Sequence, residues 1–347
     1  MTAAVTATAD LEPTLADKVR FLSRPETYGR PDSEVMERRE THMSWVFFAG
    51  DRVYKLKKPV RLPYLDFSTL ERRRRACEAE LRLNRRLAAD VYLELAPLVE
   101  REGVLRLGGP GRVADWLVVM RRLGEDRMLE RRLADHVQDR ELDELAALLV
   151  RFYRHARRVH VCPARHMADW RGALAYNRRI LLEPRLELPA GLVRRIDAVQ
   201  RRFLRLHGDR LAARAREGRI LDAHGDLRPE HIWLNDGIRI IDCLEFSAAL
   251  RANDPMDEIA FLDLECERLG TPEAGRRVRD RVLKALNEAP ESPLYAFYRS
   301  YRATLRARLS IAHLLEPDPR TPEKWPRRTR AYLAIALEDA LRLERWL

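Results

Sequence analysis

The sequence ILDAHGDLRPEHIWLNDGIRIIDCLEF, residues 220–246, decides the fold of this chain. Two apolar stretches flank the Asn-Asp-Gly turn at 235–237, which predicts a β-hairpin. The polar loop 224–231 precedes the first strand, and Asp242 follows the second. In an antiparallel pair the start of one strand lies beside the end of the other, so we expect Asp226 and Asp242 to face one cavity. A base and a metal ligand so placed suit phosphoryl transfer.

The composition is that of a folded protein rather than a disordered one, with 46% hydrophobic and 34% charged residues. No apolar run approaches the length of a membrane span. The N-terminus has neither the positive start nor the apolar core of a secretory signal. The four cysteines show no C-x-x-C spacing, which favours reduced thiols. We therefore expect a cytoplasmic protein without membrane contact.

The charge balance favours an anionic ligand, because 65 Lys and Arg residues face 54 Asp and Glu residues, a net charge of +11. Nucleic-acid binding through arginines is the weaker alternative, since no zinc-finger spacing, RNP-like motif or zipper accompanies the charge. The chain has only six lysines, and three of them lie within residues 55–58. Because arginine stands at most other basic positions, this cluster indicates that a compact ammonium group is needed there.

The chain divides into a loose tail (1–14), a strand-rich part (15–121) and a helical part (122–347) that contains the hairpin. Strands at 44–48 and 52–56 are expected to form a second hairpin. Ser68 and Glu71 form a capping-box pattern that predicts the start of a helix. On that helix Glu80 lies near the apolar face and Glu78 points away, so Glu80 is the carboxylate expected to reach inward.

These segments resemble the protein-kinase-like superfamily. Residues 224–231 resemble the catalytic loop H-R-D-L-x-x-x-N in its small-molecule form, with glycine after histidine. Residues 242–245 resemble the metal-binding Asp motif, and 254–260 resemble the following helix of aminoglycoside phosphotransferases. The resemblance covers about residues 40 to 315 and implies an α+β, two-lobe fold with a small β-rich N-lobe and a larger helical C-lobe.

Three further segments are similar to a family of uncharacterised bacterial aminoglycoside-phosphotransferase-like proteins. They are THMSW at 41–45, VYKLKKP at 53–59 and LNRRL at 83–87. Many members of that family carry an additional C-terminal P-loop ATPase domain. This chain has no Gly-Lys dipeptide and hence no P-loop motif, so we expect that domain to be absent.

The resemblance implies a role for each residue of the loop. Asp226 would accept or orient the proton of an acceptor hydroxyl. Arg228 would stabilise charge on the transferred phosphoryl group. His224 and Asp257 would support the loop, with Asp257 bracing it from the next helix.

The resemblance also implies a nucleotide site in the strand-rich part. Lys55 would contact the α- and β-phosphates of ATP and pair with Glu80. Lys57 shares a strand face with Lys55 and is the alternative phosphate lysine. The hinge that reads adenine would be formed by backbone groups of Val119, Met120 and Arg121.

The metal ligands include a departure from the family pattern. Asp242 would hold Mg²⁺, but His231 stands where the family has a metal-binding asparagine, and imidazole is a poor Mg²⁺ ligand. Either Glu245 supplies the second oxygen ligand, or one metal ion suffices, or a softer ion such as Mn²⁺ is used, or catalysis has been lost. The strands at 44–56 also lack a G-x-G-x-x-G loop.

The sequence therefore predicts an ATP- and Mg²⁺-dependent phosphotransferase that acts on a hydroxyl of a small molecule. Acidic residues near the expected acceptor site, Asp263, Glu265 and Glu267, are candidates to bind a cationic substrate or are surface charges. The alternative is a nucleotide-binding pseudokinase that acts as a regulator or scaffold, which the replacement by His231 suggests.

Overall fold

The computed structural model describes residues 12–31, 36–62, 64–317, 319 and 321–347. Contacts divide the chain into two units. Unit 1 comprises Met1–Gly124 and Arg239–Ser247, and unit 2 comprises Glu125–Ile238 and Ala248–Leu347. The short segment Arg239–Ser247, with Asp242 and Glu245, thus packs with the N-terminal part of the chain.

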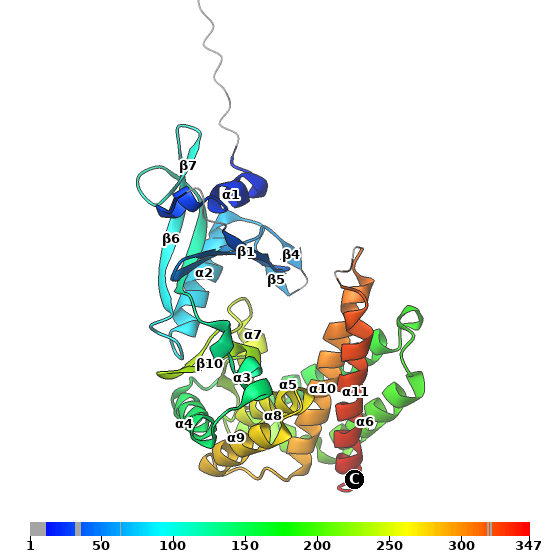
Figure 1. Cartoon of the computed structure of the whole chain (residues 1–347). Coiled ribbons are helices and arrows are strands. Elements are labelled where there is room, and N and C mark those ends of the chain that lie inside the picture. The colour runs from blue at the N-terminus through cyan, green and yellow to red at the C-terminus, as the bar shows by residue number, and fades with distance from the viewer. Residues whose placement is uncertain (1–11, 32–35, 63, 318, 320) are drawn as a thin grey trace, which may run out of the picture. The chain divides into compact units, whose positions relative to one another are not determined.

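Unit 1 is built on a curled antiparallel sheet with strand order β1-β2-β3-β8-β6-β7 (Figure 1). Its strands are β1 (Glu37–Glu40), β2 (Ser44–Ala49), β3 (Arg52–Lys57), β6 (Tyr92–Arg101), β7 (Val104–Leu107) and β8 (Arg112–Arg121); β4 (Arg61–Leu62) and β5 (Leu65–Asp66) form a separate pair. The hairpin predicted at 44–56 is confirmed, with Ser44 opposite Lys57. Gly50 turns it with φ 61°, a conformation that suits glycine.

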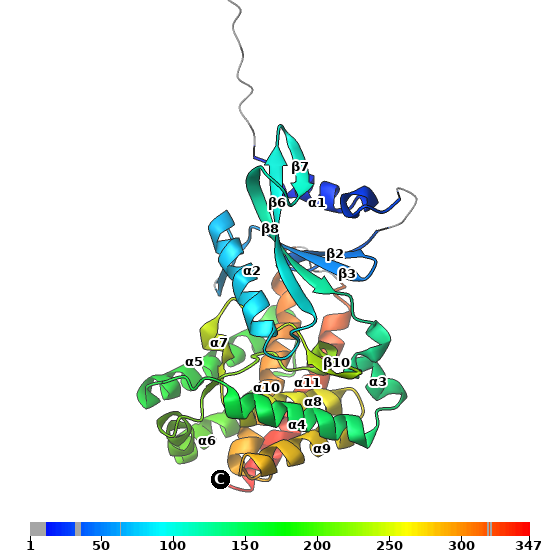
Figure 2. The same ribbon diagram turned by 90° about the vertical axis from the view of Figure 1, so that its left-hand side faces the viewer.

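Helices cover the two faces of this sheet differently. They are α1 (Leu15–Leu22) and α2 (Leu70–Asn84), with a 3₁₀ turn η1 (Pro25–Tyr28). Leu56 of β3 packs in a core with Leu22 of α1, whereas α2 packs against β8 and β6 (Figure 2). Because side chains alternate along a strand, Lys55 and Lys57 leave β3 on the opposite face from Leu56, and both reach Glu80 of α2.

The start of α2 corrects the predicted capping box. The N-cap is Thr69, whose side chain accepts from the N–H of Arg72. Ser68 instead donates its hydroxyl to Asp66. Both residues are good N-caps, and the Asp66 carboxylate decides between them by engaging Ser68 before the helix begins.

Unit 2 is mainly helical. Its helices are α3 (Leu129–Asp135), α4 (Asp139–His155), α5 (Pro163–Leu181), α6 (Ala190–Arg216), α7 (Ala248–Arg251), α8 (Pro255–Arg268), α9 (Pro272–Ala285), α10 (Pro293–Ala312) and α11 (Lys324–Glu344). Sequence analysis did not predict α5, because few apolar residues mark its buried side: only Met167, Leu174, Asn177 and Leu181 are buried. The 3₁₀ turns of unit 2 are η2 (Glu125–Arg127), η3 (Pro184–Leu186), η4 (Pro229–His231) and η5 (His313–Leu315).

The predicted hairpin at 232–240 is confirmed as β10 (Ile232–Asn235) and β11 (Gly237–Ile240), and the boundary between the units falls within β11. A second short pair joins β9 (Leu221–Asp222) to β12 (Ala252–Asn253). This pair holds the residues before the polar loop beside the start of α8.

A hydrophobic core of unit 2 lies where α6, α8, α10 and α11 pack together (Figure 1). Phe261 and Leu264 of α8 meet Ala307 of α10 and Leu333 of α11 there. Within the described residues, no helix is both long and apolar enough to span a bilayer.

Candidate active site

Unit 1 contains a lysine cluster made of Lys55, Lys57, Glu80, Asp242 and Glu245. The Lys55 ammonium lies 2.8 Å from Glu80 Oε1 and 3.2 Å from Asp242 Oδ1. The expected Lys55–Glu80 pair is therefore present, and it includes Asp242 from far along the chain. Burial alone would lower the pKa of Lys55, but Asp242 and Glu80 outweigh it and raise that pKa well above its ordinary value. Lys55 is thus a fixed positive charge.

Lys57 has a different position from Lys55. Its ammonium lies 2.6 Å from Glu80 Oε2 and 2.5 Å from Glu245 Oε1, and its side chain is 1% exposed against 16% for Lys55. Glu245 is also nearly buried. Lys57 and Glu245 therefore neutralise each other inside unit 1, and the geometry favours Lys55 over Lys57 as the phosphate-binding lysine.

The backbone at Asp242 has an unusual conformation. Asp242 is a non-glycine residue with φ 62°, in the left-handed region. Its N–H donates to the Tyr92 hydroxyl at 3.1 Å, and the N–H of Cys243 donates to Asn84 Oδ1 at 2.8 Å. These two hydrogen bonds hold the Asp242 carboxylate beside Lys55 while its side chain stays 49% exposed.

The predicted hinge residues Val119, Met120 and Arg121 end β8, an interior strand paired with β3 and β6. The N–H of Arg121 donates to the Val91 carbonyl, and that of Arg122 donates to the Asp51 carbonyl. Both amides are therefore engaged within unit 1.

Unit 2 contains the polar loop 224–231, in which Asp226 is paired with Arg228. The Arg228 guanidinium contacts Asp226 Oδ2 through Nε at 3.0 Å and Nη2 at 2.7 Å, and it also contacts Glu230. Burial raises the pKa of Asp226, but the charges of Arg228 and Arg306 outweigh it and lower that pKa. Asp226 is thus ionised at neutral pH.

His231, predicted as a possible metal ligand, is engaged inside this loop. Its Nδ1 lies 2.8 Å from the carbonyl oxygen of Asp226, and its Nε2 lies 3.1 Å from Nη2 of Arg228. The first contact requires a donor at Nδ1 and the second an acceptor at Nε2, which together describe a neutral imidazole. His231 therefore uses both ring nitrogens to position Asp226 and Arg228.

Support for the loop differs from the expectation for Asp257. That carboxylate pairs with the guanidinium of Arg302 in a two-point contact of 2.8 and 2.5 Å. The next residue, Glu258, accepts from the N–H groups of His224 and Gly225 at 3.2 and 2.6 Å. Sequence analysis missed Glu258; its place in the first turn of α8 was the only available signal.

His224 is buried, as expected of a support residue, at 1% exposure. Its Nδ1 accepts from the N–H of Asp226 at 3.4 Å. The loop is thus held at two places, by Glu258 from outside and by His224 and His231 from within.

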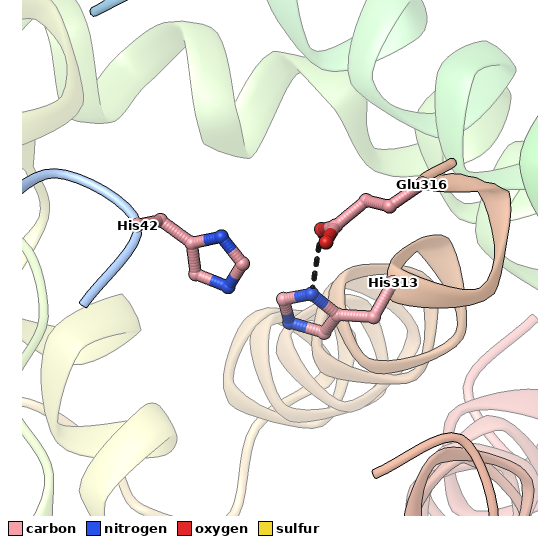
Figure 3. A group of neighbouring side chains, drawn as sticks. All are labelled: His42, His313 and Glu316. Atoms are coloured by element: carbon pink, nitrogen blue, oxygen red, sulfur yellow. Dashed lines mark hydrogen bonds and ion pairs between the residues drawn. The ribbon is translucent and has the colours of Figure 1, made fainter. Parts of the chain in front are cut away.

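A third group of titratable residues lies near the end of α10. His313 Nδ1 is 2.9 Å from Glu316 Oε1 (Figure 3). The His313 ring also stacks on Trp325. His42, also drawn in Figure 3, belongs to unit 1. Among the described residues of unit 2, His313 and Glu316 are two donor groups here, fewer than the three protein ligands of catalytic zinc sites.

The chemistry of the carboxylates fits a magnesium ion at one position. Mg²⁺ prefers oxygen ligands and is commonly held by one or two carboxylates together with substrate phosphates. Asp242 offers a half-exposed carboxylate beside the lysine expected to contact phosphates. Glu245 is turned toward buried Lys57 and His231 is engaged in its own loop, so Asp242 is the residue of the three that fits.

Solved structures place this chain in the protein-kinase-like, two-lobe α+β fold class. It is similar to a choline/ethanolamine kinase family protein of Mesorhizobium loti (TM-score 0.51, 15% identity, 94% of this chain and 99% of that one). A GDP complex of a mutant aminoglycoside 2'-phosphotransferase-IIIa gives a TM-score of 0.50 at 15% identity, over 93% of this chain and 97% of that one. The ethanolamine kinase of Plasmodium vivax gives 0.50 at 10% identity, over 89% and 83%. The resemblance to aminoglycoside phosphotransferases is thus confirmed at the level of the fold.

Among sequences, the chain is 34% identical over 300 residues to uncharacterised proteins of Mycobacterium tuberculosis and Mycobacterium bovis. The match covers 83% of this chain and 57% of those proteins, so the chain spans little more than half of their length. No protein-family model matches the sequence.

Proposed function

We propose that this protein is a phosphotransferase that moves the γ-phosphoryl group of ATP to a hydroxyl of a small molecule. The observation that carries the proposal is the pair of contacts made by Lys55, which joins Glu80 and Asp242 in one cluster. A phosphate-binding cation and a metal-binding carboxylate then stand side by side, as phosphoryl transfer requires. The similarity in fold to small-molecule kinases supports the same reading.

In this proposal unit 1 binds the nucleotide. Lys55 contacts the phosphates as a permanent cation, and Glu80 holds the lysine in place. Asp242 holds Mg²⁺, which when bound neutralises charge on the phosphates. The fixed backbone at Asp242 removes the need to reorganise the carboxylate when the nucleotide arrives.

Unit 2 supplies the transfer chemistry. The acceptor hydroxyl oxygen bonds the γ-phosphorus while the bond from that phosphorus to the β,γ-bridging oxygen breaks. ADP leaves with the electron pair, and the hydroxyl proton passes to Asp226. Arg228 holds Asp226 through two nitrogens and presents its charge at the same place, where it would stabilise the phosphoryl group.

The experiment is a transfer assay that follows ADP release from Mg–ATP across a panel of hydroxylated small molecules, with Asp226→Asn as the test variant. Removing the base should lower the transfer rate about 10²- to 10⁴-fold while ATP binding persists. Asp236→Asn, in the turn of the hairpin, is the matched control and should transfer at the wild-type rate. Equal rates in wild type and Asp226→Asn would overturn the proposal.

A pseudokinase is the second candidate, and the engagement of His231 favours it. Because both ring nitrogens of His231 are used within the loop, unit 2 lacks a ligand at the position of the family's metal-binding asparagine. A pseudokinase predicts nucleotide binding that does not depend on metal, with no ADP release from any acceptor. Its biological role would survive Asp226→Asn, whereas that of a phosphotransferase would not.

A further inference from the structure

We propose that the acceptor carries an anionic group, a phosphate or a carboxylate, which binds to arginines of α8, α10 and α11. The inference rests on the proposed phosphotransferase function and names its substrate class. It concerns a group of residues we call the Glu265 cluster: Glu265, Arg268, Arg306, Arg328 and Tyr332. All five belong to unit 2, on three helices that pack side by side (Figure 1).

The acidic side chains of α8 are committed to partners within unit 2 and do not suit a cationic acceptor. Asp263 accepts from Tyr295 and Arg299, and Glu267 also accepts from Arg299. Glu265 is fully buried, at 0% exposure. The expectation that these carboxylates bind a cationic substrate therefore has no support in their geometry.

Glu265 is surrounded by donors that outnumber it. Arg268 Nε contacts Glu265 Oε2 at 2.7 Å, Arg306 Nε contacts Oε1 at 3.1 Å, and the Tyr332 hydroxyl donates to Oε1 at 2.6 Å. Arg328 lies over the Tyr332 ring and contacts its hydroxyl oxygen at 3.4 Å. One carboxylate thus pairs with two guanidinium groups, and a third lies beside the tyrosine that also donates to it.

The terminal nitrogens of Arg268 and Arg306 remain available. Within the described part of the chain, both residues use only Nε for hydrogen bonds, and their Nη atoms are not among the buried polar atoms that lack a partner. Those Nη groups therefore reach solvent. The Nε of Arg328 is buried and has no hydrogen-bond partner among the described residues. Guanidinium groups with open donors bind phosphate and carboxylate oxygens in two-point contacts.

The Glu265 cluster is near the loop that holds Asp226. Glu258, which braces His224 and Gly225, precedes Glu265 by seven residues on α8. Seven residues are two helical turns, so the two carboxylates lie on one face about 10 Å apart. The charge of Arg306 acts on Asp226, and Arg228 is close enough to feel both Arg306 and Glu265.

When the charged side chains of the loop 224–231 are counted together with the Glu265 cluster, the cations still outnumber the carboxylates. Arg228, Arg268, Arg306 and Arg328 are four cations, and Asp226, Glu230 and Glu265 are three carboxylates. A small molecule with a hydroxyl at Asp226 and an anionic group at the Nη atoms of Arg268 and Arg306 would balance this charge. A cationic acceptor would add to the excess.

The test is a calorimetric titration of inorganic phosphate into the full chain saturated with Mg²⁺ and the non-hydrolysable ATP analogue AMP-PCP. The analogue occupies the nucleotide phosphates, so further phosphate binding reports on another site. Arg306→Lys keeps the charge beside Glu265 but removes the two-point contact, and Arg328→Gln leaves both Nε contacts to Glu265 intact. We expect each variant to weaken phosphate binding about tenfold or more. Arg330→Gln, exposed on the same helix, is the control and should bind as wild type does.

Transfer assays then distinguish the kinds of anion. Glycerol 3-phosphate and glycerate should be better acceptors than glycerol, and choline should be the poorest. The preferred member of the first pair identifies a phosphate or a carboxylate acceptor. Arg306→Lys should raise the KM for the anionic acceptor by a larger factor than that for glycerol.

Several results would overturn the inference. One is that phosphate does not bind to the AMP-PCP complex, or binds equally to wild type, Arg306→Lys and Arg328→Gln. Another is preference for choline over the anionic acceptors. AMP-PCP binding to the wild type is measured first. If AMP-PCP does not bind, the proposed function is rejected. If AMP-PCP binds but phosphate does not, only the anionic acceptor is rejected.

Discussion

The lysine cluster of unit 1 and the Glu265 cluster of unit 2 are both networks of buried charge, but their balance is opposite. In unit 1 two lysines share three carboxylates, those of Glu80, Asp242 and Glu245. In unit 2 two arginines, Arg268 and Arg306, share the single carboxylate of Glu265, and Arg328 contacts the Tyr332 hydroxyl beside it. The first is suited to gain a cation and the second an anion. The excess charge of each cluster therefore indicates the opposite charge of the ligand that it can bind.

The two clusters also differ in the type of cation, which is lysine in unit 1 and arginine in unit 2. Lysine presents a compact charge that two carboxylates can share, as Lys55 and Lys57 both do. Arginine can use one nitrogen for a structural contact and keep two for a ligand. Arg268 and Arg306 are bound to Glu265 in that way.

The largest expected effect separates the two lysines of unit 1. Lys57→Met leaves the nearly buried Glu245 without its partner, so the free energy of unfolding should fall by about 3–5 kcal/mol. Lys55→Met leaves Glu80 paired with Lys57 and Asp242 half exposed, so the loss should be about 1–2 kcal/mol. Urea unfolding of both variants measures the difference.

The two substitutions should affect nucleotide affinity in the opposite order, with the larger loss in Lys55→Met. Lys55→Met is expected to abolish Mg–ATP binding in folded protein, whereas Lys57→Met should bind wherever it remains folded. A Lys57→Met protein that is as stable as Lys55→Met would show that the two lysines are interchangeable.

The second effect concerns Asp226 in unit 2. The cations beside Asp226 overcome the effect of burial and keep its pKa low, so transfer by the wild type should show no acid limb from this group above about pH 5. Arg228→Gln removes the largest of these charges and raises the pKa, so the rate at about pH 5–6 should fall relative to that at pH 8. A rate profile measured from pH 5 to pH 8 in both proteins checks this.

The same change in the pKa of Asp226 should alter how the free energy of unfolding depends on pH. A carboxyl with a lowered folded pKa stabilises the protein above its ordinary pKa and loses that contribution as pH falls through the folded value. Arg228→Gln should therefore lose less stability on acidification than wild type. Identical pH dependence in the two proteins would show that Arg228 does not set the pKa of Asp226.

Much of this arrangement could be predicted from local sequence. The hairpins at 44–57 and 232–240 and the inward direction of Glu80 follow from turn residues, side-chain alternation and helical spacing, whereas the Lys55–Glu80 pair was implied by the resemblance to the kinase-like family. The cluster of lysines in an arginine-rich chain also pointed to β3, whose Lys55 and Lys57 both contact Glu80.

The partners chosen by tertiary packing could not be predicted in this way. Glu258 and Asp257 are adjacent carboxylates, and only the approach of Arg302 to one and of the loop backbone to the other assigns their roles. Likewise the Glu265 cluster joins α8 to residues about 40 and 67 positions later on α10 and α11. A sequence pattern within one segment cannot predict contacts between residues so far apart along the chain.

The smallest expected effect tests the geometry of unit 1 without altering its charge. Tyr92→Phe removes the hydroxyl that accepts from the N–H of Asp242, a residue held at φ 62°. We expect a loss of about 0.5–1.5 kcal/mol in stability and a twofold to tenfold weaker Mg-dependent ATP affinity, roughly the worth of one hydrogen bond. Calorimetry would reveal an unchanged affinity if the Asp242 backbone were held by other contacts alone.

The most direct test of the account is the affinity for ATP, measured by calorimetry with and without Mg²⁺, in wild type, Asp242→Asn and Asp226→Asn. The account assigns metal-dependent nucleotide binding to unit 1 and proton transfer to unit 2. It predicts Mg-dependent binding in wild type and in Asp226→Asn, and loss of the metal dependence in Asp242→Asn. Mg-dependent binding that survives in Asp242→Asn, or that disappears in Asp226→Asn, would contradict it.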